Sequence, residues 1–126
     1  MANEINVSIS ISVNKGGMNI SRAESFKVDM IGDSMTHSVQ EIDASAEVLV
    51  EADALDQAGW IFIKNLHASN YVDFARQSDT DNDEYLIRLN AGESCLFRVS
   101  ELGGTGVIYA KASAVDTNVE YVIIEK

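Results

Sequence analysis

The chain offers few side chains that could act as a nucleophile or a general base. Its two histidines, His37 and His67, lie in no recognisable catalytic context, and His67 precedes Ala68-Ser69-Asn70 as a turn histidine would. The single Cys95 cannot form an intrachain disulfide, and Cys95 and the two histidines are too few to form a structural zinc site. We therefore expect no catalytic residue, no metal site, no cofactor and no enzymatic activity.

A serine and a lysine form the sharpest catalytic candidate. Gly32-Asp33-Ser34-Met35 resembles the stretch around the nucleophile of signal peptidases and of self-cleaving repressors, which are all-β proteases with a Ser/Lys pair. That resemblance implies that Lys64, on a later apolar strand, would deprotonate Ser34. However, Thr36-His37 replaces the proline expected soon afterwards, and the acidic Gly-Asp stretch of those proteases is missing. A turn in which Asp33 and Ser34 bond the backbone is the preferred interpretation.

Three aspartates have the spacing of calcium ligands. Asp79, Asp81 and Asp83 match the first three ligand positions of an EF-hand loop. Glu84 stands where that loop needs glycine for its sharp turn, and Asn90 stands where a glutamate should complete the site. A solvated acidic loop is therefore the preferred interpretation, with an adventitious calcium at a subunit surface as the alternative.

Aromatic residues in the middle of the chain allow two interpretations. Trp60, Phe62 and Tyr71 could form a platform for a sugar, but they lie in segments rich in isoleucine and valine, where aromatic residues usually belong to a core. Cys95 alternates in phase with Phe97, which indicates a small buried hydrophobe and not a reactive thiolate.

Charge excludes several classes of partner. Nine lysines and arginines stand against twenty aspartates and glutamates in 126 residues, a formal charge of −11. Such a chain repels nucleic acid and anionic membranes, and no basic cluster is present that could bind phosphates.

The first residues lack the basic and apolar regions of a signal peptide, and no apolar run approaches the length of a membrane span. We expect a protein made in the cytoplasm.

The N-terminal segment has the clearest period in the chain. Apolar residues alternate with asparagines and serines, and they are Ile5, Val7, Ile9, Ile11 and Val13. Period 2 indicates a strand with one apolar face. Lys15-Gly16-Gly17 suits a tight turn, and one or two further strands are indicated after it by Met18, Ile20, Phe26, Val28 and Met30. A hairpin is the simple interpretation.

Short strands separated by turns follow along the rest of the chain. Residues 42–58 fit either helix or strand, and we favour strand. Residues 60–66 are apolar on both faces, which is typical of a central strand. Further strands are predicted at residues 71–75, 85–89, 95–99, 107–112 and 119–125. The pattern predicts an all-β protein: a single β-sandwich domain over residues 1–126, jelly-roll or Ig-like, with residues 1–14 as an extended N-terminal strand.

From Val39 onward the chain resembles a family of small structural proteins of tailed-phage virions. The blocks that carry the resemblance, in order, are Val39–Ile42, Gly59–Leu66, Asn70–Val72, Leu89–Glu93, Phe97-Arg98, Ile108–Ala112 and Val119–Glu125. Together they extend over about two-thirds of the chain. The order of the blocks is more specific than any one of them, because each alone is only a strand with its turn.

The resemblance implies a β-sandwich that binds the major capsid protein or other virion subunits. It favours a decoration or cement protein on the outer surface of the head, commonly trimeric, over a neck, tail or fibre-attachment component. A carbohydrate- or receptor-binding module is the further alternative. The residues themselves add an interaction site, because a long strand without charge between residues 5 and 14 and without proline is suited to edge pairing. We expect Ile5, Val7, Ile9, Ile11 and Val13 to contact an adjacent copy or the capsid protein.

Overall fold

The computed structural model describes residues 4–30, 32–33, 35–45, 47–48, 58–75, 85–98 and 108–125. Every regular element among these residues is a β-strand, which confirms the predicted all-β class. The described residues include no helix that could cross a membrane. The chain divides into two compact units, Met1–Asp33 and Ser34–Lys126.

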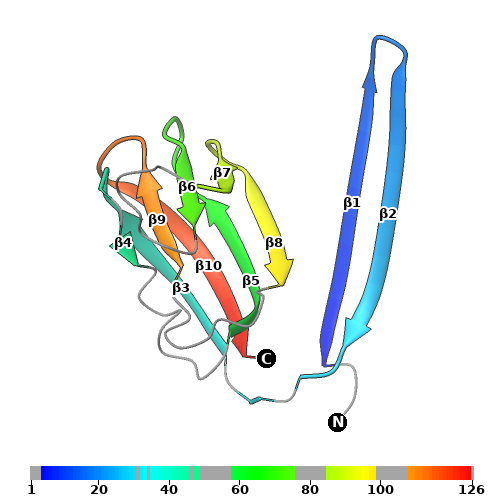
Figure 1. Cartoon of the computed structure of the whole chain (residues 1–126), viewed down its shortest axis with the longest axis horizontal. Helices are drawn as coiled ribbons and strands as arrows, with labels where there is room; N and C mark the ends of the chain where they lie inside the picture. The colour runs from blue at the N-terminus through cyan, green and yellow to red at the C-terminus, as the bar shows by residue number, and fades with distance from the viewer. Residues whose placement is uncertain are drawn as a thin grey trace. The chain divides into compact units, whose positions relative to one another are not determined.

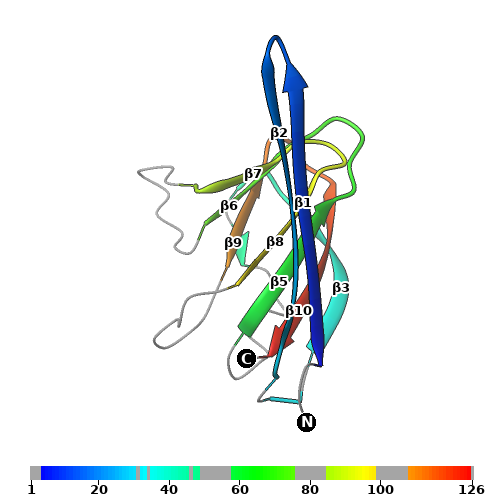
Figure 2. The ribbon, with the colours of Figure 1, turned by 90° about the vertical axis from the view of Figure 1, so that its right-hand side faces the viewer.

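The first unit is a long antiparallel hairpin of β1 (Ile5–Lys15) and β2 (Met18–Val28), as the alternating pattern predicted (Figures 1 and 2). The register is unbroken from Ile5 opposite Val28 to Lys15 opposite Met18. Gly16 and Gly17 have φ angles of 54° and 89°, and this pair of positive values is typical of the two-residue turn whose twist matches that of the strands. The backbone NH of Met30 donates to Glu4 Oε2 at 3.1 Å just beyond the paired strands.

The limits of this unit differ from the arm expected at residues 1–14. The apolar strand returns on itself at the glycine turn, so β2 belongs to the same compact unit, which extends to Asp33. The physical reason is backbone pairing: one strand alone leaves its hydrogen-bonding groups unpaired, and β2 satisfies those on one edge of β1.

The second unit contains two four-stranded antiparallel sheets. The first sheet has the order β3-β10-β5-β8, with bounds β3 (Met35–Ile42), β10 (Thr117–Glu125), β5 (Ala58–Asn65) and β8 (Ser94–Arg98). The second sheet has the order β4-β9-β6-β7, with bounds β4 (Glu47–Val48), β9 (Tyr109–Ala112), β6 (Val72–Ala75) and β7 (Ile87–Leu89). Figure 2 shows β3, β5 and β10 in one layer and β6, β7 and β9 in another.

One apolar core joins the two sheets. Its buried members come from both sheets and from the residue before β9, and they are Ile42, Ile61, Ile63, Val72, Phe74, Leu89, Ile108, Ala110, Ala112, Val119, Tyr121 and Ile123. In β5, β6, β9 and β10 they recur at every second position, so one face of each sheet faces the core. The second unit is therefore sandwich-like, with β5 as a central strand between β10 and β8, as its apolar sequence predicted.

The strands pair in nested order. β3 pairs with β10, β4 with β9, β5 with β8 and β6 with β7, so the first four strands of the sandwich meet the last four in reverse. The strand favoured within residues 42–58 is confirmed at Ile42, at Glu47–Val48 and at Ala58, the first residue of β5, but residues 43–45 are not part of a strand. Residue 46 and residues 49–57 lie outside the described part.

Candidate functional site

The hairpin has two chemically different faces. Residues directly opposite one another in an antiparallel pair share a face, so the register assigns every side chain of β1 and β2. One face, called the apolar face below, consists of Ile5, Val7, Ile9, Ile11, Val13, Lys15, Met18, Ile20, Arg22, Glu24, Phe26 and Val28. The other, called the polar face, consists of Asn6, Ser8, Ser10, Ser12, Asn14, Asn19, Ser21, Ala23, Ser25 and Lys27.

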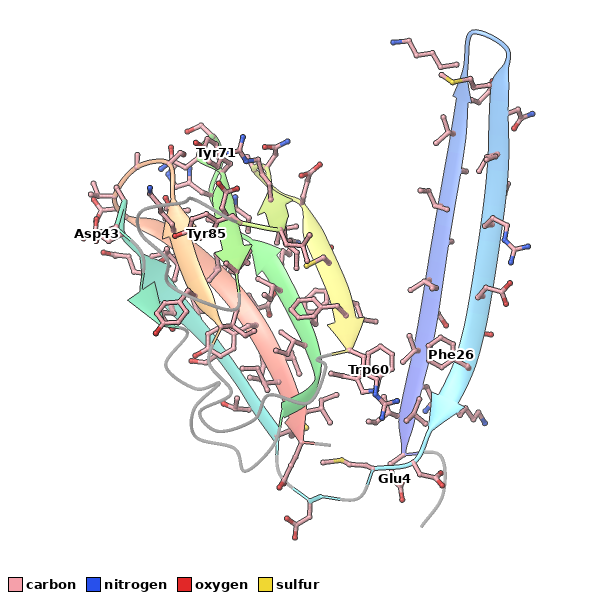
Figure 3. All side chains as sticks on the ribbon, in the orientation of Figure 1. Glu4, Phe26, Asp43, Trp60, Tyr71 and Tyr85 are labelled. Atoms are coloured by element: carbon pink, nitrogen blue, oxygen red, sulfur yellow. The ribbon has the colours of Figure 1, made fainter. Side chains whose placement is uncertain are left out.

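Most of the apolar face is open to solvent. Six of its apolar side chains are exposed, and their exposed fractions are 41% for Phe26, 42% for Val13, 50% for Ile9, 59% for Ile20, 61% for Ile11 and 62% for Met18. Ile5 and Val28 are partly buried, and Val7 is buried. Figure 3 shows the side chains of β1 and β2 as sticks, with Phe26 labelled on β2. Exposed apolar side chains gathered on one face are typical of sites of interaction with another macromolecule.

An ion pair interrupts the apolar face near its middle. Arg22 Nη2 donates to Glu24 Oε1 at 2.6 Å, and both side chains are more than half exposed. Arg22 lies opposite Ile11, and Glu24 lies opposite Ile9. The β1 side of the face is thus aliphatic up to Lys15, whereas the β2 side has one positive and one negative charge between apolar ends.

The predicted interaction residues are therefore one half of a larger surface. Ile5, Val7, Ile9, Ile11 and Val13 all share the apolar face, although their role in binding stays a prediction. The β2 half was missed as part of the site: Met18, Ile20, Phe26 and Val28 were recognised only as strand residues. The two-glycine turn could have identified these β2 residues as part of the site. Two strands that pair across such a turn place residues at equal distances from it on the same face of the hairpin.

The candidate serine protease pair is not supported by what the structure describes. Lys64 lies on β5, and its side chain is exposed on the face opposite Ile61 and Ile63, away from the core. This mechanism needs a buried lysine beside the serine, and the lysine at this position is exposed. Ser34 lies outside the described residues.

Both histidines make structural contacts. The Nδ1 of His67 accepts from the backbone NH of Ser69 at 3.0 Å and from that of Asn70 at 2.8 Å, so its ring closes the turn after β5, as predicted. His37 Nε2 lies 2.7 Å from Glu120 Oε2 on the neighbouring strand β10, where the two form a partly exposed cross-strand pair.

Cys95 faces the core together with Phe97. Burial raises the pKa of its thiol above the ordinary value, which lowers the thiolate fraction at neutral pH. The predicted small, unreactive cysteine is consistent with this position.

The aromatic residues are divided among different surfaces. Trp60 and Phe62 alternate with core residues Ile61 and Ile63, so they project from the outer face of β5, and the expectation that they belong to the core is wrong. Arg98 lies over the Trp60 ring, with 5.8 Å between the guanidinium carbon and the ring centroid.

Tyr71 lines a shallow hollow of about 220 Å³ at the outer face of the second sheet, together with Asp73, Tyr85, Arg88, Lys111 and Ala112. The Arg88 guanidinium carbon lies 3.8 Å from the Tyr71 ring centroid, and two nitrogens of Arg88 bond the Asp73 carboxylate at 2.7 and 3.0 Å. The hydrogen bond to Asp73 raises the pKa of Arg88. Arg88 thus occupies one face of the tyrosine ring on which a sugar would stack (Tyr71 and Tyr85 are labelled in Figure 3).

The candidate calcium ligands Asp79, Asp81 and Asp83 lie outside the described residues. Among the residues that are described, no three His, Cys, Asp or Glu side chains gather in a way that could hold a metal ion.

Among the described residues, the feature that best suggests binding is therefore the apolar face of the hairpin. Comparison with known proteins adds no family to this description: no protein-family model, no curated protein and no solved structure matches the chain.

Proposed function

We propose that the protein is a non-enzymatic structural subunit of a tailed-phage virion, a decoration or cement protein on the outer surface of the head. Its sandwich would bind the major capsid protein or neighbouring subunits and stabilise the shell through those contacts. The resemblance of residues 39–125 to small virion proteins suggests this role, and the nested strand order is the structural observation that supports it best.

Within this proposal the sandwich is a jelly roll. Pairing of β3 with β10, β4 with β9, β5 with β8 and β6 with β7 is the pattern of one long antiparallel hairpin that has rolled up into two sheets. Among the described strands of the sandwich, β6 and β7 are the one consecutive pair that shares a sheet. Jelly rolls form the shells of many viruses and also occur in lectins and enzymes, so the fold supports the proposal by analogy.

Charge favours the outer surface. Residues 34–126 contain six lysines and arginines against sixteen aspartates and glutamates, a formal charge of −10. Packaged DNA would repel such a unit from the inside of a head. The same charge keeps free subunits apart in solution before they bind a shell.

Copy counting tests the proposed position. Particles from the host culture would be purified on a density gradient, and the protein would be quantified by mass spectrometry against the major capsid protein. A decoration subunit predicts a copy number comparable to that of the capsid protein. A few copies per particle would favour the neck or tail, and absence from purified particles would overturn the proposal.

A further inference from the structure

We propose that the apolar face of the hairpin packs against the same face of the hairpin of a second copy, related by a two-fold axis. The contact is a property of the chain itself, so it goes beyond the proposed place on a virion and is testable on purified protein.

A two-stranded hairpin with an exposed apolar face is stabilised when that face packs against another element. Isolated hairpins of two strands are marginal in water, and stable ones pack an apolar face against another element. Six apolar side chains of this hairpin are more than two-fifths exposed, from Phe26 at 41% to Met18 at 62%. The polar face, with its serines and asparagines, provides no comparable reason for burial.

The outer face of the first sandwich sheet of a second copy fits this role poorly. Two of its rows are mostly apolar, but one of them ends at Arg98 and the other at His37: Met35, Ile124, Trp60 and Arg98 form the first, and His37, Val122, Phe62 and Leu96 form the second. The next row on that face places Glu120 beside Lys64, and His37 binds the same glutamate. The apolar face is eleven residues long, so it would cover these charges as well.

The apolar face is instead complementary to itself. When two copies stack with their strands in opposite directions, rows that lie equally far from the middle meet. The middle falls between the Ile9–Glu24 row and the Ile11–Arg22 row. Glu24 of one copy then faces Arg22 of the other, twice over, and Ile9 of one copy faces Ile11 of the other.

The outer rows also match in this arrangement. Phe26 meets Ile20 of the second copy and Val28 meets Met18, as the register requires. Val13 meets the row of Val7, whose side chain is already buried within its own copy. Lys15 meets Ile5 at the rim, where its ammonium group can stay in water. No buried charge is left without an opposite charge.

The size of the face predicts a weak dimer. The face has twelve side chains in each copy, of which Val7 is already buried, and this is fewer than the roughly 20–30 residues a side of a standard interface. We expect a Kd of the order of 10–100 μM in solution. Such a weak contact forms to a greater extent where many copies are held side by side, because the local concentration of the hairpins is then high.

Disulfide trapping tests the register. Two variants with Ile9→Cys and Ile11→Cys, each also with Cys95→Ala, would be mixed at 100 μM under mild oxidation. The mixture should give covalent dimers at least five-fold faster than a mixture of Ser10→Cys and Ser12→Cys, which lie on the polar face. Equal rates for the two mixtures, or no dimers from either, would overturn the proposal.

Charge reversal tests the chemistry by sedimentation velocity of the full chain. Arg22→Glu should raise the dimer Kd at least ten-fold, because it places glutamates opposite one another, and Arg22→Glu with Glu24→Arg should restore it. Lys27→Glu makes the same change in charge on the polar face and should leave the Kd within two-fold. Two-fold packing of this face would be contradicted if Arg22→Glu and Lys27→Glu changed the dimer Kd equally. It would also be contradicted if the wild-type chain formed a trimer, or stayed a monomer at 500 μM. Hydrogen exchange of the β1 and β2 amides checks that each variant still forms the hairpin.

Discussion

The side-chain amide of Asn65 donates to the backbone carbonyl of Leu89 across 3.1 Å, and this bond joins the end of β5 in one sheet to the end of β7 in the other. The same amide donates to the carbonyl of Asn70 at 2.7 Å, and the Asn65 side-chain oxygen accepts from the NH of His67 at 2.9 Å. The side chain is fully buried. One amide thus satisfies three backbone groups at one end of the sandwich.

We expect Asn65→Ala to lower the free energy of unfolding by about 2–4 kcal/mol, because backbone groups at a buried site lose their partners. Urea unfolding followed by circular dichroism measures the change. Asn118→Ala is the matched control, since Asn118 is exposed on the neighbouring strand β10, and it should change the stability by less than about 0.5 kcal/mol. Similar losses in both variants would show that Asn65 has no special role.

Asn65 also shows what the sequence could and could not predict. It follows Ile61 and Ile63 at alternate positions, so its phase indicates an inward side chain. However, the carbonyl groups that it binds belong to Asn70 and Leu89, which are 5 and 24 residues away along the chain, and no local sequence pattern predicts these bonds. The strand could be predicted, whereas the polar network at its end required the fold.

A similar contrast holds for the hairpin. The alternation from Ile5 to Val13 and the two glycines after Lys15 predicted both the strand and its return, because period and turn chemistry are local. The division of the chain at Asp33 had no such signal, since no proline, glycine-rich stretch or change of composition marks it.

Trp60 and Phe62 were assigned to the core because both faces of β5 are apolar. In such a strand the sequence pattern does not indicate which side chains point inward.

The core between the sheets should be sensitive to a change in volume. Phe74, on β6, is 1% exposed and belongs to the cluster shared by both sheets. Phe74→Ala should cost about 3–5 kcal/mol of unfolding free energy, as large-to-small changes in cores do. Thermal unfolding measures the loss. Leu86→Ala should be nearly neutral, because Leu86 is 90% exposed, and an equal loss there would argue against the sandwich core.

The hairpin turn should depend on glycine for backbone reasons alone. Gly17 has a φ of 89°, and a Cβ built there meets nothing within 4 Å. Gly17→Ala should therefore destabilise the hairpin by about 1–2 kcal/mol through its backbone conformation, without a clash. Hydrogen exchange should become faster at the β1 and β2 amides and stay unchanged in the sandwich.

Gly16→Asn is the control for that experiment, because asparagine tolerates the positive φ of 54° at this position. It should leave exchange in β1 and β2 nearly unchanged. Faster exchange throughout the chain in Gly17→Ala would mean that the two units unfold together, against the division at Asp33.

Cys95 should react slowly and should link stability to alkaline pH. Burial raises the pKa of its thiol, so the folded protein holds the thiol proton more tightly than the unfolded chain does. The resulting stability is fully present below the ordinary thiol pKa and is lost as the pH rises through the raised value. Alkylation by iodoacetamide at pH 8 should be several-fold slower in the folded protein than in urea. Equal rates would contradict a thiol that faces the core.

The most direct test of the proposed function is a cryo-electron microscopy reconstruction of the purified particle. We predict eight-stranded sandwiches with the nested pairing of β3–β10 in a regular array on the outer surface of the head, with the apolar faces of hairpins from different copies in contact. A head surface without this subunit, in particles that contain the protein elsewhere or not at all, would contradict the account.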